Sequence, residues 1–317
     1  KADIMKILLF GGTGFLGKNL AEYLLYKNYD LGMYIRPHAL NQSFIQRWKS
    51  DINLYMGEFQ DEKNFKSIVH GYDVIYHLIS STIPGVINPL QDIETTIKPS
   101  LRLLQACVEE SVKRVVFFSS GGTVYGIPEK LPIQENYFGQ PISSYGIQKQ
   151  TMERYLQFYQ YCYNLPIIIL RIANPYGRFQ RPFSKQGLIA NILGKFLTGA
   201  PIEIWGDGRV IRDYIYADDV IDAAERVLHY NGQYNVFNIG SGKGESINDI
   251  IHIVDQLTSS NLIVKRYPGR KVDVPVNVLD ISRAQKELGW NPTISLEQGI
   301  TKMLTYWDSD KKNFEGR

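Results

Sequence analysis

The sequence contains very little cysteine. Only two occur among its 317 residues, and both Cys107 and Cys162 fall in stretches with the apolar spacing of a helix. Two isolated cysteines do not make a disulfide framework, and they lack the paired spacing of a structural zinc site. We therefore predict two buried thiols in a reducing compartment, no disulfide, no metal site, and a cytoplasmic protein.

Net charge and long apolar runs are equally scarce. The formal net charge is +3, which gives no electrostatic reason to expect a nucleic-acid partner. No apolar run approaches the roughly 18 residues that suggest a membrane span. The first ten residues lack the order of a signal peptide, and residues 1–4, which precede Met5, are left out of the fold argument. We expect a protein that binds neither nucleic acid nor membrane.

What the sequence does contain is a regular alternation of short apolar runs and amphipathic helices. The expected strands lie at 6–10, 31–35, 74–79, 114–118 and 166–172, and the expected helices at 18–28, 99–111 and 144–163. Continuous apolar strands are typical of a parallel sheet that is covered on both faces. This pattern predicts an α/β fold with a Rossmann-type, doubly wound parallel sheet.

The pattern loosens after about residue 174. Glycine and proline become more frequent, a helix is expected at 187–199, and a turn is expected at 205–210. We predict that this part builds a smaller, mixed α/β domain and that the two domains share a cleft.

A glycine-rich turn follows the first expected strand. The sequence "GGTGFLG" places Gly11, Gly14 and Gly17 before an amphipathic helix. Glycines at this position let the backbone approach a pyrophosphate at the helix N-terminus. The turn therefore predicts a dinucleotide site, whereas three glycines without this context would indicate only a tight turn.

The end of the second strand leaves the choice of dinucleotide open. A carboxylate there would bind the ribose 2′-hydroxyl of NAD, and an arginine would suit the 2′-phosphate of NADP. The sequence has Arg36 and no acid, so NADP stays an alternative, as does an arginine that stacks on adenine. Glu58, after the third strand, is a candidate acceptor for the adenine amine or a solvated turn residue.

Tyr145 and Lys149 lie four residues apart on an expected helix, so both side chains share one face. A phenol is a weak base at neutral pH, but a nearby ammonium and the positive ring of a nicotinamide lower its pKa. Tyr145 could then take a proton from a hydroxyl while hydride leaves the same carbon. Taken alone, the pair would fit an amphipathic tyrosine over a solvated lysine. Its position after the glycine turn and after "SSGGTVYG" favours chemistry.

Taken together, these motifs resemble an extended short-chain dehydrogenase/reductase, and within that group the nucleotide-sugar epimerases related to UDP-glucose 4-epimerase. The resemblance covers nearly the whole chain and includes "GGTGFLG", "SSGGTVYG", "SYGIQK", "LRIANPYG", "IWGDGRVIRDYIYADDV" and "FNIGSGKGESI". It implies a dinucleotide-binding domain at 1–176 with about 213–240, and a nucleotide-sugar-binding domain at 177–212 and 241–317.

The resemblance also implies roles for particular residues. Tyr145 is the expected base, and Lys149 its activator and ribose anchor. Asn174 would hold the sugar nucleotide, and Arg212 and Arg270 would grip its diphosphate, a role suited to guanidinium donors. The full set expected at the cofactor is Gly11, Gly14, Phe15, Leu16, Gly17, Arg36, Glu58, Phe59, Ser119, Tyr145 and Lys149.

One position departs from the family pattern. Gly121 stands where the family has a catalytic Ser or Thr, so Thr123 is our first candidate for the missing hydroxyl and Ser120 the second. Sugar-nucleotide 4,6-dehydratases carry an acid at the positions of Gly122 and Thr123, and UDP-glucuronate decarboxylases carry one at the latter. Neither carboxylate is present, which disfavours both activities and favours epimerisation.

The resulting hypothesis is a nucleotide-sugar 4-epimerase with tightly bound NAD that interconverts UDP-glucose and UDP-galactose. Asn277 matches a position beside the sugar ring whose bulk limits acetamido groups. Asparagine is intermediate in size, so UDP-GlcNAc and UDP-GalNAc are further candidate substrates. The alternatives are an NADPH-dependent keto-sugar reductase and a non-catalytic dinucleotide sensor. The helices at 98–111 and 145–163 match those through which relatives form a homodimer.

Overall fold

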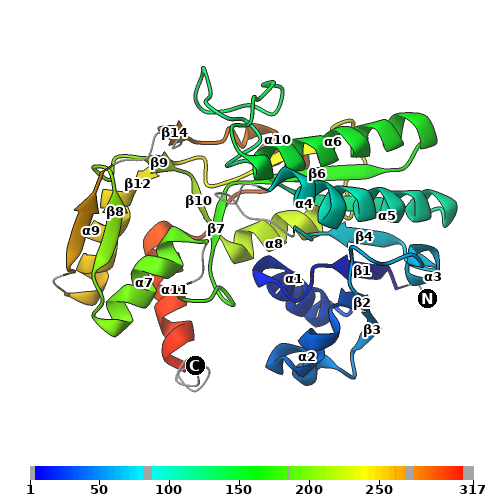
Figure 1. The fold of residues 1–317 in the computed structure, drawn as a ribbon, viewed down its shortest axis with the longest axis horizontal. Helices are drawn as coiled ribbons and strands as arrows, with labels where there is room; N and C mark the ends of the chain where they lie inside the picture. Colours follow the sequence, from blue (N-terminus) through cyan, green and yellow to red (C-terminus); the bar gives the residue numbers. More distant parts are fainter. Residues whose placement is uncertain (1–3, 81–87, 184–185, 261, 269–273, 310–317) are drawn as a thin grey trace.

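A seven-stranded parallel sheet forms the centre of the protein (Figure 1). The computed structural model describes residues 4–80, 88–183, 186–260, 262–268 and 274–309. The strands, in spatial order, are β3 (Ile52–Met56), β2 (Asp30–Ile35), β1 (Lys6–Phe10), β4 (Val74–His77), β5 (Arg114–Ser120), β6 (Ile167–Ile172) and β11 (Val236–Ile239). Every neighbouring pair is parallel. The predicted doubly wound sheet is confirmed.

Helices cover both faces of this sheet, which explains why its strands are continuously apolar. In β1, Ile7 and Leu9 belong to one buried cluster, and Leu8 and Phe10 belong to the cluster on the opposite face. The first cluster is closed by α1 (Phe15–Tyr26) and α8 (Ala217–Arg226), which pack on each other. The second is closed by α3 (Phe65–Val69), α5 (Lys98–Glu109) and α6 (Ser144–Tyr163).

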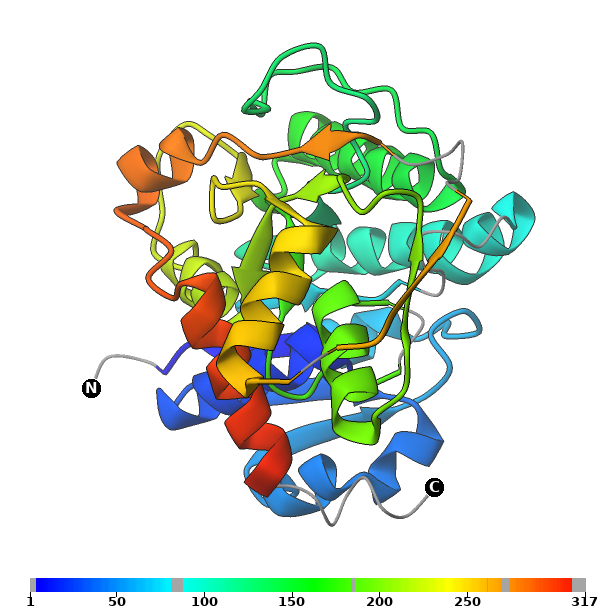
Figure 2. The ribbon, with the colours of Figure 1, turned by 90° about the vertical axis from the view of Figure 1, so that its left-hand side faces the viewer.

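A smaller lobe lies beside the sheet and has its own core (Figure 2). Its main helices are α7 (Leu188–Thr198), α9 (Ile247–Thr258) and α11 (Leu296–Ser309), and its strands β8 (Ile202–Trp205) and β13 (Val264–Tyr267) form a parallel pair. Ile192, Ile250 and Met303 are buried together in this core. The predicted helix at 187–199 therefore belongs to the smaller lobe.

Short elements join the sheet to the smaller lobe. Strand β7 (Asn174–Tyr176) pairs with β10 (Tyr214–Tyr216), and β9 (Ile211–Arg212) lies between β12 (Glu245–Ser246) and β14 (Val276–Asn277). The remaining helices are α2 (Ser43–Trp48), α4 (Pro89–Asp92), α10 (Ser282–Leu288), the 3₁₀ turn η1 (Pro37–Asn41) and the π-helical turn η2 (Ile93–Ile97). The chain leaves the large sheet after β6 and enters the smaller lobe. It returns to add β11 at the edge of the sheet and then leaves the sheet again. The exact domain division stays a prediction.

The prediction of two buried thiols was wrong for one of them. Cys107 is fully buried in α5, whereas Cys162 is exposed. Burial along α6 ends at Tyr159, and residues 161–164 extend beyond the surface that the sheet covers. Helical periodicity cannot show at which residue a helix extends past the sheet that buries it. Among the described residues, no helix is long and apolar enough to cross a membrane.

Candidate active site

The glycine turn connects β1 to α1 at the point where the order of the sheet strands reverses. Open α/β sheets bind ligands at this place, beyond the carboxyl ends of the strands. Gly14 caps α1 with extended backbone, and a Cβ added there would meet only the carbonyl oxygen of Gly11, at 3.4 Å. A Cβ at Gly17 would lie 2.2 Å from that same oxygen. Gly17 therefore lets α1 pack on the glycine turn, while Gly14 leaves the backbone bare at the start of the helix.

Arg36 and Glu58 face each other at the ends of β2 and β3. Arg36 Nε lies 3.8 Å from Glu58 Oε2, and both side chains are about half exposed. The roles predicted for Arg36 and Glu58 at the adenosine end of the cofactor therefore depend on each other, because the two side chains form one ion pair. Phe59 follows Glu58, but its ring is buried against Phe10 at a centroid distance of 5.9 Å. Only the backbone of Phe59 is available to a cofactor.

The structure brings Tyr145 and Lys149 together on the first turns of α6. Ser143 caps the helix by accepting a hydrogen bond from Gly146 N at 3.1 Å. Lys149 is buried, and its Nζ donates to the carbonyl oxygen of Phe118 in β5 at 2.8 Å. The same Nζ lies 5.7 Å from the centre of the Tyr145 ring. A strand carbonyl therefore fixes the ammonium beside the phenol.

Burial works against the charged forms of both members of this pair. It raises the pKa of Tyr145 to about 12. It lowers the pKa of Lys149 to about 8, although the Glu153 carboxylate acts in the opposite direction. In the protein alone the phenol is protonated at neutral pH, so proton abstraction needs additional positive charge at the site.

The two serines at the end of β5 point to different partners. Ser119 donates its hydroxyl hydrogen to the carboxylate of Glu153, which Arg171 also binds through hydrogen bonds of 2.6 and 3.1 Å. Cofactor binding by Ser119 stays a prediction. Because the side chain is engaged with Glu153, the backbone of Ser119 would have to make that contact. Ser120 and Asn174 both lie near Gly122: a Cβ at Gly122 would lie 4.0 Å from Ser120 Oγ and 3.6 Å from Asn174 Oδ1. Two polar side chains thus converge over Gly122.

Gly121 lacks a side chain because its neighbours occupy the space. A Cβ there would lie 2.5 Å from Leu279 Cδ1 and 3.0 Å from the carbonyl oxygen of Arg171. Leu279 is fully buried and comes from the C-terminal part of the chain. The family Ser or Thr has no room at this position unless Leu279 moves.

Thr123 and Asn277 present buried polar atoms beside this glycine. Thr123 Oγ1 is buried and has no hydrogen-bond partner among the described residues, and the same holds for Asn277 Oδ1. The amide nitrogen of Asn277 donates to the carbonyl oxygen of Gly121 at 3.1 Å. Buried polar groups are rarely left without a partner, so these two atoms indicate a place where a ligand can bind.

Arg212 lies beside Asn277 because β9 and β14 pair these two residues. Its Nη1 donates to the carbonyl oxygens of Ile211 and Val274, at 2.8 and 2.6 Å. Arg270, the other arginine predicted at the diphosphate, lies outside the described residues. The structure therefore places one of the two arginines next to the proposed sugar site.

Sequence reasoning missed the buried ionic groups that hold the site together. Asp213 is fully buried and accepts hydrogen bonds from Ser241, Gly242 and Leu279. Burial raises its pKa to about 6. Glu153 and Arg171 form a second buried pair below β5. Asp213 and Arg171 lie inside motifs that also hold predicted site residues, which was their only sequence signal, whereas Glu153 lies merely in the helix expected at 144–163.

Comparison with known proteins identifies the family. A family model described as the NAD dependent epimerase/dehydratase family matches residues 7–240. The chain belongs to this family. It is therefore an enzyme of the NAD-dependent epimerase/dehydratase family, as the resemblance of its motifs implied.

Relatives of this family member carry more than one activity in their names. A UDP-glucose 4-epimerase structure from Thermotoga maritima, with UDP-glucose, is 33% identical, has a TM-score of 0.88 and covers 97% of this chain and 100% of its own. A UDP-glucose 4-epimerase from Thermus thermophilus, in complex with NAD, is 25% identical with a TM-score of 0.84, over 96% and 99% of the two chains. A dTDP-4-dehydro-6-deoxyglucose reductase from Escherichia coli is 32% identical, over 94% and 96%.

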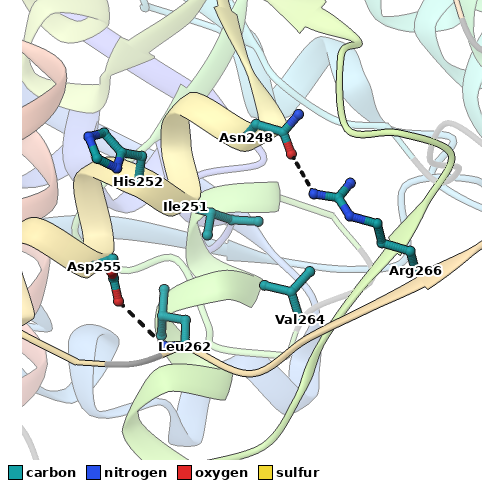
Figure 3. Close-up of a pocket in the computed structure, with 7 residues that line it drawn as sticks. All are labelled: Asn248, Ile251, His252, Asp255, Leu262, Val264 and Arg266. Atoms are coloured by element: carbon teal, nitrogen blue, oxygen red, sulfur yellow. Dashed lines mark hydrogen bonds between the residues drawn. The ribbon is translucent and has the colours of Figure 1, made fainter.

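A pocket on the outer face of the smaller lobe is separate from this family site. It has a volume of about 420 Å³ and lies between α9 and β13 (Figure 3). Arg266 in its wall donates to Asn248 Oδ1 at 3.0 Å and to the carbonyl oxygen of Asp207 at 2.7 Å. Asp255 accepts a hydrogen bond from the backbone of Leu262. These polar groups are bound within the lobe, and none of the predicted site residues lines the pocket.

Proposed function

We propose that this enzyme is a nucleotide-sugar 4-epimerase that interconverts UDP-glucose and UDP-galactose. The observation that carries the proposal is the Tyr145–Lys149 pair beside a turn that contains no carboxylate at residues 121–123. Oxidation and reduction at carbon 4 need a base and a hydride carrier, whereas elimination or decarboxylation needs an added acid or base at this turn. The 4-epimerase names of relatives support the same reaction.

The residues around the first turn fit a bound NAD. Gly14 leaves backbone bare at the N-terminus of α1, and no acidic residue stands in the first turn of that helix, so a pyrophosphate is accommodated there. We assign Gly11, Phe15, Leu16 and Gly17 to the same cradle. Glu58 neutralises Arg36 and would repel a 2′-phosphate, which favours NAD over NADP. When bound, this cofactor accepts a hydride from the sugar and returns it.

Tyr145 is the proposed base for the sugar 4-hydroxyl. It takes the hydroxyl proton as carbon 4 is oxidised and gives the proton back after the 4-keto sugar has turned over. Lys149, held by the carbonyl oxygen of Phe118, is proposed to stabilise the phenolate together with the positive nicotinamide ring, which would supply the additional positive charge that the buried phenol needs. We assign Thr123, whose hydroxyl has no partner within the described parts of the chain, to a hydrogen bond with the reacting oxygen, and keep Ser120 as second candidate.

Residues of both lobes are proposed to hold the nucleotide sugar. Arg212 and Arg270 would bind the diphosphate, and Asn174 would contact the sugar beside Ser120. The amide oxygen of Asn277, near Gly121, has no partner among the residues that the structure describes. This polar, medium-sized wall supports UDP-GlcNAc and UDP-GalNAc as further substrates.

The direct test uses the purified protein without added cofactor. Incubation with UDP-galactose should produce UDP-glucose catalytically, because the cofactor is regenerated in each turnover. UDP-GalNAc in a parallel reaction tests the wider specificity. The cofactor released on denaturation should be NAD. Absence of conversion with every one of these sugars, by protein that retains NAD, would contradict the proposal.

A keto-sugar reductase is the second candidate function. The Escherichia coli reductase is 32% identical to this chain over nearly its full length, and Gly121 departs from the epimerase pattern. A reductase would consume one NADPH for each sugar reduced. Stoichiometric NADPH oxidation with a 4-keto nucleotide sugar, without epimerisation, would favour it. Retention of the Tyr145–Lys149 pair argues against the third alternative, a non-catalytic sensor.

We also propose a homodimer through α5 and α6. These helices pack on each other, and α6 carries large apolar side chains that stay exposed in the single chain, including Ile147 at 53% and Phe158 at 50%. Large apolar groups that stay exposed along a helix indicate a protein interface. The low cysteine content supports our further proposal that the protein works in the cytoplasm.

A further inference from the structure

A buried carboxylate outside the predicted site contacts the first turn of the catalytic helix from another element. Asp92 is the last residue of α4, and only 3% of it is exposed. One of its carboxylate oxygens accepts a hydrogen bond from Ser144 Oγ, and the other accepts one from Gln148 Nε2 at 3.2 Å. Ser144 directly precedes Tyr145, and Gln148 directly precedes Lys149. One side chain thus binds the neighbour of each member of the pair.

The position of the Asp92 carboxylate, beside the N-terminus of α6, is also electrostatically favourable. The first turn of α6 contains no acidic residue of its own, although negative charge stabilises a helix N-terminus. Asp92 brings that charge from α4. A second contact strengthens the arrangement, because Ser80, just after β4, donates to Gln148 Oε1 at 3.2 Å. Gln148 therefore links α4, the end of β4 and the catalytic helix.

We propose that Asp92 is a positioning residue, which holds the first turn of α6 so that Tyr145 and Lys149 keep the geometry needed for proton transfer. Its hydrogen bonds go to the neighbours of the pair, so it acts through the helix backbone and does not take part in the chemistry. The kinetic consequence of this proposal rests on the proposed function. The structural consequence, a more mobile first turn without Asp92, does not.

The kinetic test compares Asp92→Ala and Asp92→Asn with a matched control, Glu94→Ala. Glu94 lies two residues further on, is 63% exposed and pairs only with Lys98 among the contacts described, at 2.9 Å. Asp92→Ala should lower kcat about a hundredfold, the effect of a displacement of about 1 Å, and leave KM for the UDP-sugar nearly unchanged. Asp92→Asn keeps one acceptor and should recover part of the rate. Glu94→Ala should behave like the original protein. All rates are divided by the concentration of NAD-loaded enzyme, so a loss of folded protein does not change the kcat that is compared.

A second measurement needs no substrate. Amide hydrogen exchange of the peptide that covers residues 144–149 should accelerate at least tenfold in Asp92→Ala and stay unchanged in Glu94→Ala. If the original protein converts no UDP-hexose, the proposed function fails and the exchange result still decides on Asp92. Unchanged exchange in Asp92→Ala, or an unchanged kcat in an active enzyme, would overturn the positioning role.

Discussion

The glycine turns after β1 and β5 look alike in sequence but use glycine for different neighbours. After β1, Gly17 leaves room for the backbone of Gly11, and a Cβ at Gly14 would meet only the carbonyl oxygen of Gly11, at 3.4 Å. After β5, Gly121 leaves room for Leu279, a side chain 158 positions further along the chain. A glycine motif thus shows only that a side chain is absent at that position. The fold is needed to show which neighbouring group occupies the space. In the proposed function, the first turn binds the cofactor and the second borders the chemistry.

The largest expected effect is on the chemistry beside the second turn. Tyr145→Phe removes the proposed base, and general acid–base catalysis contributes about 10²–10⁴-fold, so activity should fall by about three orders of magnitude. Binding at the first turn should be intact, with NAD still released on denaturation. Tyr155→Phe, on the same helix, is the control. Unchanged turnover in Tyr145→Phe would refute the role of this residue as base.

The next effect breaks the first turn in two distinguishable ways. Gly17→Ala forces a Cβ against backbone, which costs about 1–3 kcal/mol of unfolding free energy or more, and it should also lose NAD. Gly14→Ala meets no such clash and should keep nearly its full stability while binding NAD more weakly. Denaturant unfolding and the NAD content of the purified variants measure both. Equal unfolding midpoints for these two variants would contradict the assignment.

A smaller effect tests what fills the space at the second turn. Gly121→Ala should lower the unfolding free energy by about 1–3 kcal/mol through its clash with Leu279, and Gly122→Ala should lower it far less. The loss in the double variant Gly121→Ala/Leu279→Ala should be smaller than the sum of the losses in the two single variants, since the two changes concern one contact. Denaturant unfolding of the four proteins provides this cycle. Strict additivity would show that Leu279 is not the obstacle.

The smallest expected effect concerns the hydroxyl that replaces the family Ser or Thr. Thr123→Val should lower kcat about tenfold, the value of one hydrogen bond to a charged oxygen, and leave stability nearly unchanged. The substitution removes a buried hydroxyl that makes no hydrogen bond to any described residue, so no large loss of stability is expected. Ser120→Ala should be measured in parallel. If only Ser120→Ala lowers kcat, the second candidate replaces Thr123.

The local features of the site could be predicted from the sequence. Strand, turn and helix around Gly14 follow from apolar spacing and glycine placement, and the four-residue spacing of Tyr145 and Lys149 places them on one helix face. Which residues of a helix are covered by the rest of the fold was harder to predict from the sequence. Cys162 has the same local pattern as Cys107, but α6 extends past the sheet at that end, so only one of the two is buried.

The supports of the site could not be predicted, because they depend on contacts between distant segments. Asp92 meets Ser144 across 52 positions, and Asn277 meets Gly121 across 156. Helical or strand periodicity contains no record of such pairs. A single buried acid such as Asp92 also looks, in sequence, like any polar residue of a short exposed helix. Its importance appears only when both of its oxygens have partners on α6.

The position of Leu279 has a consequence for how the protein is made on the ribosome. Synthesis proceeds from the N-terminus, and domains begin to fold as they emerge. Strands β1 to β6 are complete long before residues 274–281 are available to cover Gly121 and, through Leu279, to reach Asp213 and pair with Ile133. A nascent chain that stops short of this segment has its sheet but lacks the residues that cover Gly121. If the proposed function holds, synthesis of residues 274–281 therefore sets the earliest point at which the new enzyme can become active.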